Sequence, residues 1–483
     1  MKQDYLEQDA TGLAEMVASK QVSASELLDI ALELADTHNP ALNAIVIDGR
    51  DVARRSIEQG LPAGPFQGVP FLIKDLGIAA VDFPTNNGSK LTQNMKWPVN
   101  SAMFERVRDT GVVTFGRTAS PEFGVGPATE AQVYGAPTRN PWNLNHTPGG
   151  SSGGTGASVA AGIVPAAHGS DGGGSVRIPA SSCGLVGFKP TRARLPSGPL
   201  SGEGWGGMAI DGFLTRTMRD TAAFLDACEG MDLGAPYTAP AMTGSFMDAL
   251  RAEQKPLKVR FTTETLSGDP IHDECQQAVR DAAKLLADLG HDVEELQLPP
   301  TLAVSDMMHA WTKIVACGTA LSVAKSLGGK PLEREMVEGV TWGAVEYAKG
   351  VSGADYLDAV NEVHAFGRRM EGLMADFDVL ITATLGQPPA TIGQLKPDNE
   401  DFWDYRNGPG GVFEYSPFTA VFNASGQPAV SLPLHWSADN LPVGVQLAMP
   451  FGADERLMTL CAQIEKAAPW FSKQQEIISR LNA

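Results

Sequence analysis

Cysteine is scarce in this 483-residue sequence, and its few copies are scattered. The five cysteines are Cys183, Cys228, Cys275, Cys317 and Cys461, and no two of them are spaced as CxxC. This pattern argues against a disulfide framework and against a structural zinc site, and it fits reduced thiols in the cytoplasm. We therefore expect a cytoplasmic protein without a structural metal.

The sequence also has few positively charged residues relative to acidic ones, and it has no long apolar run. The sequence has 37 Lys and Arg against 56 Asp and Glu, a formal net charge of −19. A chain this acidic repels phosphate backbones and anionic lipid, so nucleic acid and membrane surfaces are not expected partners. No run of about 18 apolar residues occurs, which predicts no membrane span. The polar start at residues 1–7 lacks the apolar core of a secretory signal.

The remaining composition is ordinary for a globular protein, with 43% hydrophobic residues, and several elements can be predicted. Ser23 and Glu26 form a capping box before a helical apolar pattern over 23–38, which we expect Asn39-Pro40 to end. A strand–helix–strand order over 257–298 predicts an α/β architecture. Further helices are predicted over 10–19, 273–289 and 454–467 and through most of 303–372, and strands over 44–47, 68–73, 112–115, 257–261, 293–298, 378–381, 429–432 and 443–447.

Glycine is abundant, with 52 residues, and it clusters in two segments. Residues 149–156 read GGSSGGTG, and residues 169–179 read GSDGGGSVRIP. Each segment holds a serine just after a glycine run, Ser151 and Ser175, and these lie 24 residues apart. Consecutive N–H groups of such a run can turn toward one point and hold a phosphate or a developing oxyanion. Close packing between elements explains such glycines equally well.

Several chemistries can be weighed for these segments. No lysine follows either run as a P-loop requires, and the spacing fits a dinucleotide fingerprint poorly. An esterase elbow, Gly-x-Ser-x-Gly, is absent around Ser175. A serine nucleophile needs a base, and His146 and His168 come with no evident Asp partner. Lys74 ends an apolar run over 69–73; it would be neutral if buried there, or it would extend its amine into solvent.

Taken together, these segments resemble the amidase signature family of amide hydrolases. The resemblance rests on GVPFLIKD at 68–75 and on the two glycine-rich boxes, and it continues at 183–191, 423–429 and 441–446. It spans about residues 9–467. It implies an α/β fold with a large mixed, twisted β-sheet flanked by helices on both faces. We predict one domain over 1–483, with an N-terminal helical arm over about 1–60, catalytic boxes over 68–190 and a mostly helical insertion over about 300–372.

The resemblance also implies roles for individual residues. Ser175 would be the nucleophile that forms an acyl-enzyme, and Ser151, after a cis peptide bond, would pass its proton to the base Lys74. No metal or organic cofactor is implied. The implied oxyanion hole consists of the N–H groups of Gly172, Gly173, Gly174 and Ser175. Asp171 and Arg177 would hold the loop, and Ser152 would either bond Lys74 or cap the glycine-rich loop. The family often has threonine or an aliphatic residue at the position of Gly172, so a more mobile loop is expected here.

The substrate is less well defined by the sequence. Within the family, Asp9–Thr11, 138–144 and 176–181 resemble the 6-aminohexanoate cyclic dimer hydrolases, which open nylon-related cyclic amides. We predict a serine amidohydrolase that cleaves a small, mostly uncharged amide. A homodimer is a possible assembly of the chain. Phe123, Gly124 and Cys317 are candidate pocket residues, although a small buried thiol is the favoured interpretation of Cys317. The alternatives are an aryl-acylamidase, a carbamate hydrolase, the glutaminase subunit of a tRNA amidotransferase, and a catalytically silent binding module.

Overall fold

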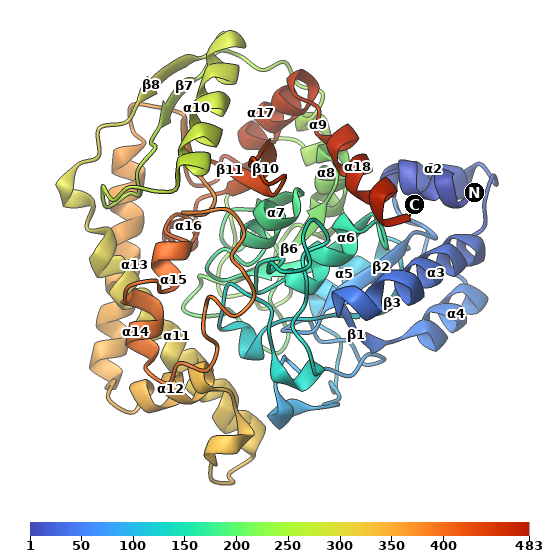
Figure 1. Cartoon of the computed structure of the whole chain (residues 1–483), viewed down its shortest axis with the longest axis horizontal. Helices are drawn as coiled ribbons and strands as arrows, with labels where there is room; N and C mark the ends of the chain where they lie inside the picture. Colours follow the sequence, from blue (N-terminus) through green and yellow to red (C-terminus); the bar gives the residue numbers. More distant parts are fainter. Residues whose placement is uncertain (483) are drawn as a thin grey trace.

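The computed structural model describes residues 1–482, and within them two β-sheets organise the chain (Figure 1). The strands are β1 Ile45–Asp48, β2 Pro70–Lys74, β3 Val113–Thr118, β4 Ala166–Asp171, β5 Val186–Lys189, β6 Ile210–Thr215, β7 Lys258–Phe261, β8 Asp292–Glu295, β9 Val379–Ala383, β10 Ala429–Trp436 and β11 Pro442–Ala448. The helices are α1 Lys2–Glu7, α2 Ala10–Ala18, α3 Ala24–Leu42, α4 Arg50–Gln59, α5 Ala102–Asp109, α6 Gly153–Ala160, α7 Arg177–Cys183, α8 Met218–Cys228, α9 Phe246–Ala249, α10 Asp273–Asp288, α11 Val304–Leu327, α12 Gly339–Ala348, α13 Gly353–Leu373, α14 Phe402–Asn407, α15 Val412–Tyr415, α16 Thr419–Ser425, α17 Asp454–Ala467 and α18 Phe471–Asn482.

The larger sheet is mixed and draws on distant parts of the chain. Within residues 1–482 it has eight strands in the order β4-β6-β5-β10-β11-β9-β7-β8. The pairings of β7 with β8 and with β9 are parallel, and the pairings from β4 through to β9 are antiparallel. Helices flank this sheet, with α7 and α10 packed on β11 and α8 on β6. The predicted α/β class with a large mixed sheet is thus confirmed. The single domain stays a prediction, supported by a sheet that joins residues 166–448.

A second, smaller sheet carries Lys74, the candidate base. Its order is β1-β3-β2, with β2 parallel to β3 and β1 antiparallel to it. Strand β2 is buried along its whole length and ends at Lys74. It packs on β4 of the large sheet and on α6. The end of β2 therefore faces the segment where β4 leads into the second glycine-rich box.

Several predicted elements are confirmed, and some boundaries are wrong. The capping box of Ser23 and Glu26 is present in both directions. The helix that follows does not stop at Asn39 but runs to Leu42 with Pro40 inside it. Pro40 lies in the last turn, where its missing N–H removes one helical hydrogen bond only. Asn43 then ends the helix in a left-handed conformation, with its N–H donating to the carbonyl of Asn39. Strands β4, β5 and β6 were not predicted, and neither were the helices α1, α4, α5, α7, α8, α9, α14, α15, α16 and α18.

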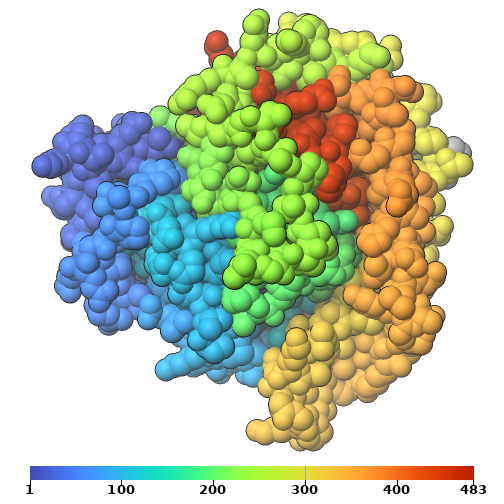
Figure 2. Space-filling model, turned by 180° about the vertical axis from the view of Figure 1, so that it is seen from behind, coloured from blue at the N-terminus to red at the C-terminus, as the bar shows by residue number. Residues whose placement is uncertain are grey.

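The predicted helical region is confirmed as α11, α12 and α13, which pack on one another. In Figure 2 its yellow and orange segments lie on one side of the molecule, and the blue N-terminal segments lie on the opposite side. Helix α11 turns Trp311 toward the second glycine-rich box. None of the helices in residues 1–482 has both the length and the apolar character needed to cross a bilayer.

Candidate active site

Lys74 lies fully buried at the point where the two sheets meet. Its side chain has 0% exposure, so the alternative in which the amine extends into solvent is wrong. The Nζ atom lies 2.6 Å from Ser151 Oγ and 2.9 Å from Ser170 Oγ. Burial lowers the pKa of Lys74 to about 7, although the charges of Asp211 and Asp171 oppose this shift. A substantial fraction of Lys74 is therefore neutral near pH 7 and able to accept a proton.

Ser151 stands in the first glycine-rich box, two residues before α6. The peptide bond between Gly150 and Ser151 is cis, as the family resemblance implies. Ser151 Oγ is held by Lys74 on one side and lines a cavity on the other. Ser152 does neither of the two things predicted for it: its hydroxyl donates to the carbonyl of Ser170 at 3.3 Å and accepts the Ser170 N–H at 3.2 Å. It thereby ties the box to β4.

Ser175 lies in the turn that joins β4 to α7. Its exposed fraction is 8%, and it lines the same cavity as Ser151 and Ser170. The structure thus brings together the three residues singled out in the sequence: Lys74 contacts Ser151, and Ser151 and Ser175 face one space. The sequence interpretation did not include Ser170, whose hydroxyl is the second one that Lys74 Nζ contacts. Its only signal is its place in the second box, next to Asp171.

A buried ion pair holds this turn in place. Asp171 and Arg177 are both fully buried, and Arg177 donates to both carboxylate oxygens at 2.9 Å. Arg177 also donates to Gln446 and Asn423, each at 2.7 Å. Burial by itself would raise the pKa of Asp171, but the charge and hydrogen bonds of Arg177, aided by Asn423, hold that pKa well below its usual range. The pair therefore stays ionised and fixes both ends of the turn.

The oxyanion-hole prediction needs one correction. The Gly174 N–H donates to Asp171 Oδ1 at 2.7 Å, so it is not free to bind an oxyanion in this conformation. The carbonyls on either side of Gly173 are also held: that of Gly172 accepts from Trp311 Nε1 at 3.3 Å, and that of Gly173 from Thr419 Oγ1 at 2.6 Å. The remaining candidate donors are the N–H groups of Gly172, Gly173 and Ser175.

The glycines of the turn also serve close packing. A Cβ atom on Gly172 would lie 2.6 Å from the ring of Trp205, and one on Gly173 would lie 2.8 Å from the ring of Trp311. Both distances are shorter than real Cβ contacts allow. Each indole ring therefore packs directly against the glycine backbone. Close packing therefore explains Gly172 and Gly173, and presentation of their N–H groups stays a prediction. The extra mobility expected from glycine at position 172 is at odds with a ring packed directly on it.

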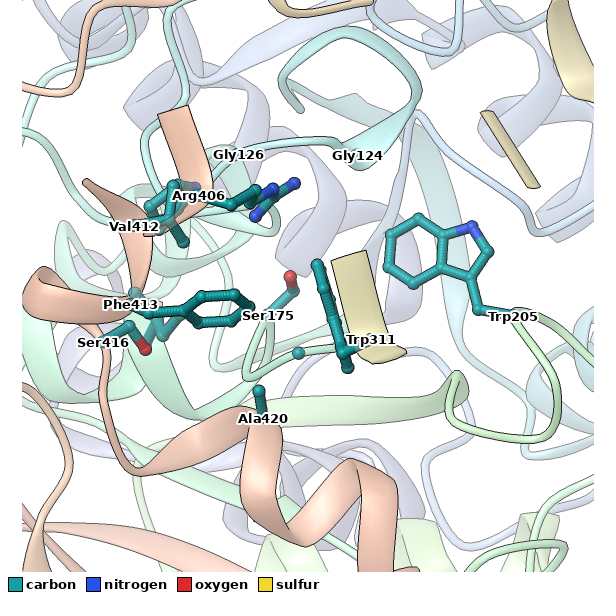
Figure 3. Close-up of a pocket in the computed structure, with 13 residues that line it drawn as sticks. Gly124, Gly126, Ser175, Trp205, Trp311, Arg406, Val412, Phe413, Ser416 and Ala420 are labelled. Carbon is teal, nitrogen blue, oxygen red and sulfur yellow. The ribbon is translucent and has the colours of Figure 1, made fainter. Parts of the chain in front are cut away.

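Two cavities meet at Ser175, and they differ in most of their lining residues. The larger includes Leu76, Phe123, Ser151, Ser170 and Trp205 among its lining residues. The smaller, shown in Figure 3, is lined by Gly124, Gly126, Pro127, Gly173, Ser175, Ile178, Trp205, Trp311, Arg406, Val412, Phe413, Ser416 and Ala420.

The structure separates the predicted pocket residues. Phe123 lines the larger cavity and Gly124 the smaller one. Cys317 lines neither of these two cavities and is half-buried. From the same helix α11, Trp311 and Ser322 reach the cavities instead. Of the lining residues that sequence reasoning missed, Trp205, Trp311 and Arg406 lie outside every motif box, so no local pattern signals them.

The likeness of the whole chain to known proteins agrees with this geometry. The amidase family model matches residues 26–458. The chain belongs to the amidase signature family. It is 37% identical to the 6-aminohexanoate-cyclic-dimer hydrolase of Paenarthrobacter ureafaciens over 98% of this chain and 97% of that protein. The predicted family and enzyme class, a hydrolase of amide bonds, are thereby confirmed.

Solved structures of other amidases superpose closely on this amidase. A 6-aminohexanoate cyclic dimer hydrolase in complex with substrate has a TM-score of 0.91 and 34% identity, covering 98% of this chain and 99% of that one. A bacterial aryl acylamidase of the same family has a TM-score of 0.87 and 29% identity, covering 98% of both chains.

Proposed function

We propose that this amidase cleaves a small amide through an acyl-enzyme on Ser175, with Ser151 and Lys74 moving the proton. The observation that carries the proposal is the 2.6 Å contact between Lys74 Nζ and Ser151 Oγ inside a buried site, beside a cavity that Ser151 shares with Ser175. Neutral Lys74 accepts the Ser151 proton, Ser151 accepts that of Ser175, and the Ser175 oxygen bonds to the carbonyl carbon.

The same relay then runs in reverse. Lys74 returns the proton through Ser151 to the amine nitrogen as the carbon–nitrogen bond breaks, and the amine departs. Water next attacks the ester carbonyl, giving its proton to the relay, and Ser175 recovers a proton as the acid leaves. The N–H groups of Gly172, Gly173 and Ser175 stabilise the oxyanion in both halves. Asp171 and Arg177 position this turn and take no proton.

The substrate is proposed to be a 6-aminohexanoate cyclic dimer or a related amide, because the chain shares over a third of its residues with a hydrolase of that compound. Aryl amides are the second candidate, favoured by the fold shared with an aryl acylamidase. A screen of linear, cyclic, aryl and carbamate amides tests the proposal. Turnover of one amide class that stops on treatment with a serine-directed phosphonate is the expected result, whereas turnover that survives modification of Ser175 would refute the mechanism.

The pH dependence of the rate should follow Lys74. Because only the neutral amine accepts a proton and the pKa of Lys74 is about 7, kcat/KM is expected to rise roughly tenfold per pH unit below that value and to level off above it. The measurement is a pH–rate profile between about pH 5 and pH 9 with a neutral amide. A flat profile over this range would contradict the role of Lys74 as base.

Two adjacent serines provide a matched test of the relay. Ser151→Ala removes the hydroxyl that contacts Lys74 and is expected to lower kcat by about 10²- to 10⁴-fold. Ser152→Ala removes a hydroxyl whose bonds within residues 1–482 are to the backbone of Ser170, and its kcat should stay within about tenfold of the wild type. Equal losses in the two variants would show that the box matters for its shape alone.

A further inference from the structure

Arg406 is a buried arginine that the proposed mechanism does not use. It lies on α14, has an exposed fraction of 3%, and lines the smaller cavity together with Ser175. Figure 3 shows its guanidinium pointing into the space that Ser175 and Trp311 also face. Its Nε atom has no hydrogen-bond partner in the part of the chain that the structure describes. Among residues 1–482 no salt bridge to Arg406 is present, in contrast to the buried Arg177, which is paired with Asp171.

Within residues 1–482, the groups that offset the charge of Arg406 are aromatic rings. Its guanidinium carbon lies 4.8 Å from the ring centroid of Trp311 and 5.2 Å from those of Phe402 and Tyr405. Burial lowers the pKa of Arg406 to about 10, which still leaves it charged at neutral pH. Cation–π contacts compensate a buried charge less well than a carboxylate does. The cavity therefore presents a desolvated cation that lacks an anion.

We propose that Arg406 binds a carboxylate carried by the substrate, so that the preferred substrates are anionic amides. The guanidinium presents N–H groups in a planar fork that matches the two oxygens of a carboxylate. The inference rests on the proposed function, because it places the carboxylate relative to the amide attacked by Ser175. It replaces the expected uncharged substrate, including the cyclic dimer proposed above, with an anionic amide, and it leaves the relay of Ser175, Ser151 and Lys74 unchanged.

The two cavities indicate which half of the amide carries this carboxylate. The leaving nitrogen must receive its proton from Ser151, and Ser151 lines the larger cavity but not the smaller one. The amine half therefore occupies the larger cavity. The acyl half occupies the smaller one with Arg406. The substrate class is the monoamide of a short dicarboxylic acid. An acyl half that ends in an ammonium group would be repelled.

The test compares matched pairs of anilides. Monoanilides of succinic, glutaric and adipic acid are assayed beside their methyl esters, which have the same chain without the charge. The wild type is expected to prefer the best acid over its ester by about 100-fold in kcat/KM, and Arg406→Gln should lose most of that preference. Arg406→Lys keeps the charge without the fork and should give an intermediate preference. Arg368→Gln, which removes an exposed arginine from α13, is the control for loss of one positive charge and should keep the wild-type ratio.

Two results would overturn the proposal while leaving the mechanism intact. One is hydrolysis of both anilide series by the wild type without preference for the acid. The other is an equal loss on acid and ester in Arg406→Gln, which would mean that Arg406 only supports Trp311. Calorimetry gives a readout that does not depend on turnover: glutarate monoanilide should bind Ser175→Ala at least tenfold more tightly than it binds the double variant with Arg406→Gln. Equal binding would reject the role of Arg406 even if no anilide is hydrolysed.

Discussion

Ser175→Ala is expected to lower kcat/KM for an amide substrate by about 10⁴-fold or more, because it removes the only atom proposed to bond to the substrate carbonyl. The side chain is small and 8% exposed at a cavity wall, so the loss of one hydroxyl leaves the packing unchanged. Thermal unfolding should therefore match that of the wild type. The measurement is steady-state hydrolysis of the best amide from the substrate screen, together with mass spectrometry of an acyl-enzyme trapped at low pH.

Ser182 offers the matched control for this variant. It lies on α7, the helix that follows Ser175, is fully buried, and its Oγ makes no hydrogen bond of good geometry within residues 1–482. Ser182→Ala should therefore retain kcat within a few-fold of the wild type. Retained turnover in Ser175→Ala, or an acyl group found on another residue, would refute Ser175 as the nucleophile. Loss of turnover in both variants would point to the shape of the turn rather than to the hydroxyl.

The residues of the proposed relay could be named from the sequence because they lie in short boxes with fixed spacing. Lys74, Ser151 and Ser175 each stand at the border of an apolar or glycine-rich run, and their neighbours show what surrounds them. The structure adds the contact between Lys74 and Ser151, whose positions lie 77 residues apart. A distance of that kind depends on the packing of β2 against β4, which no local pattern contains.

Other parts of the site were beyond the reach of local patterns. Strand β4 reads AAHGSD, and its small residues give none of the β-branched signal by which strands are predicted. Its pairing with β6, not its own propensity, makes it a strand. Trp205, Trp311 and Arg406 reach the cavities from separate loops and helices. The Gly174 N–H was misassigned because the sequence does not show that Asp171 turns back to accept it.

Arg177→Met should cost about 3–5 kcal/mol of the free energy of unfolding, since it leaves the Asp171 carboxylate buried without its cation. Asp171 also loses the main cause of its lowered pKa. In the wild type, a folded pKa below the unfolded one contributes stability that is present above the unfolded value of about 4 and is lost as the pH falls toward the folded value. The variant should show a smaller loss on acidification, because its Asp171 no longer strongly favours the ionised form.

Urea unfolding of a double-mutant cycle distinguishes the ion pair from simple packing. Asp171→Asn removes the stranded carboxylate, so the double variant Asp171→Asn/Arg177→Met should be more stable than Arg177→Met alone. Activity should fall in all three variants, because Gly174 and Arg177 both bond Asp171 and the turn that carries Ser175 depends on it. Stability of Arg177→Met within about 0.5 kcal/mol of the wild type would show that the pair is not what holds the turn. Additive losses in the cycle would mean that Asp171 and Arg177 act independently, each through its own contacts with Asn423.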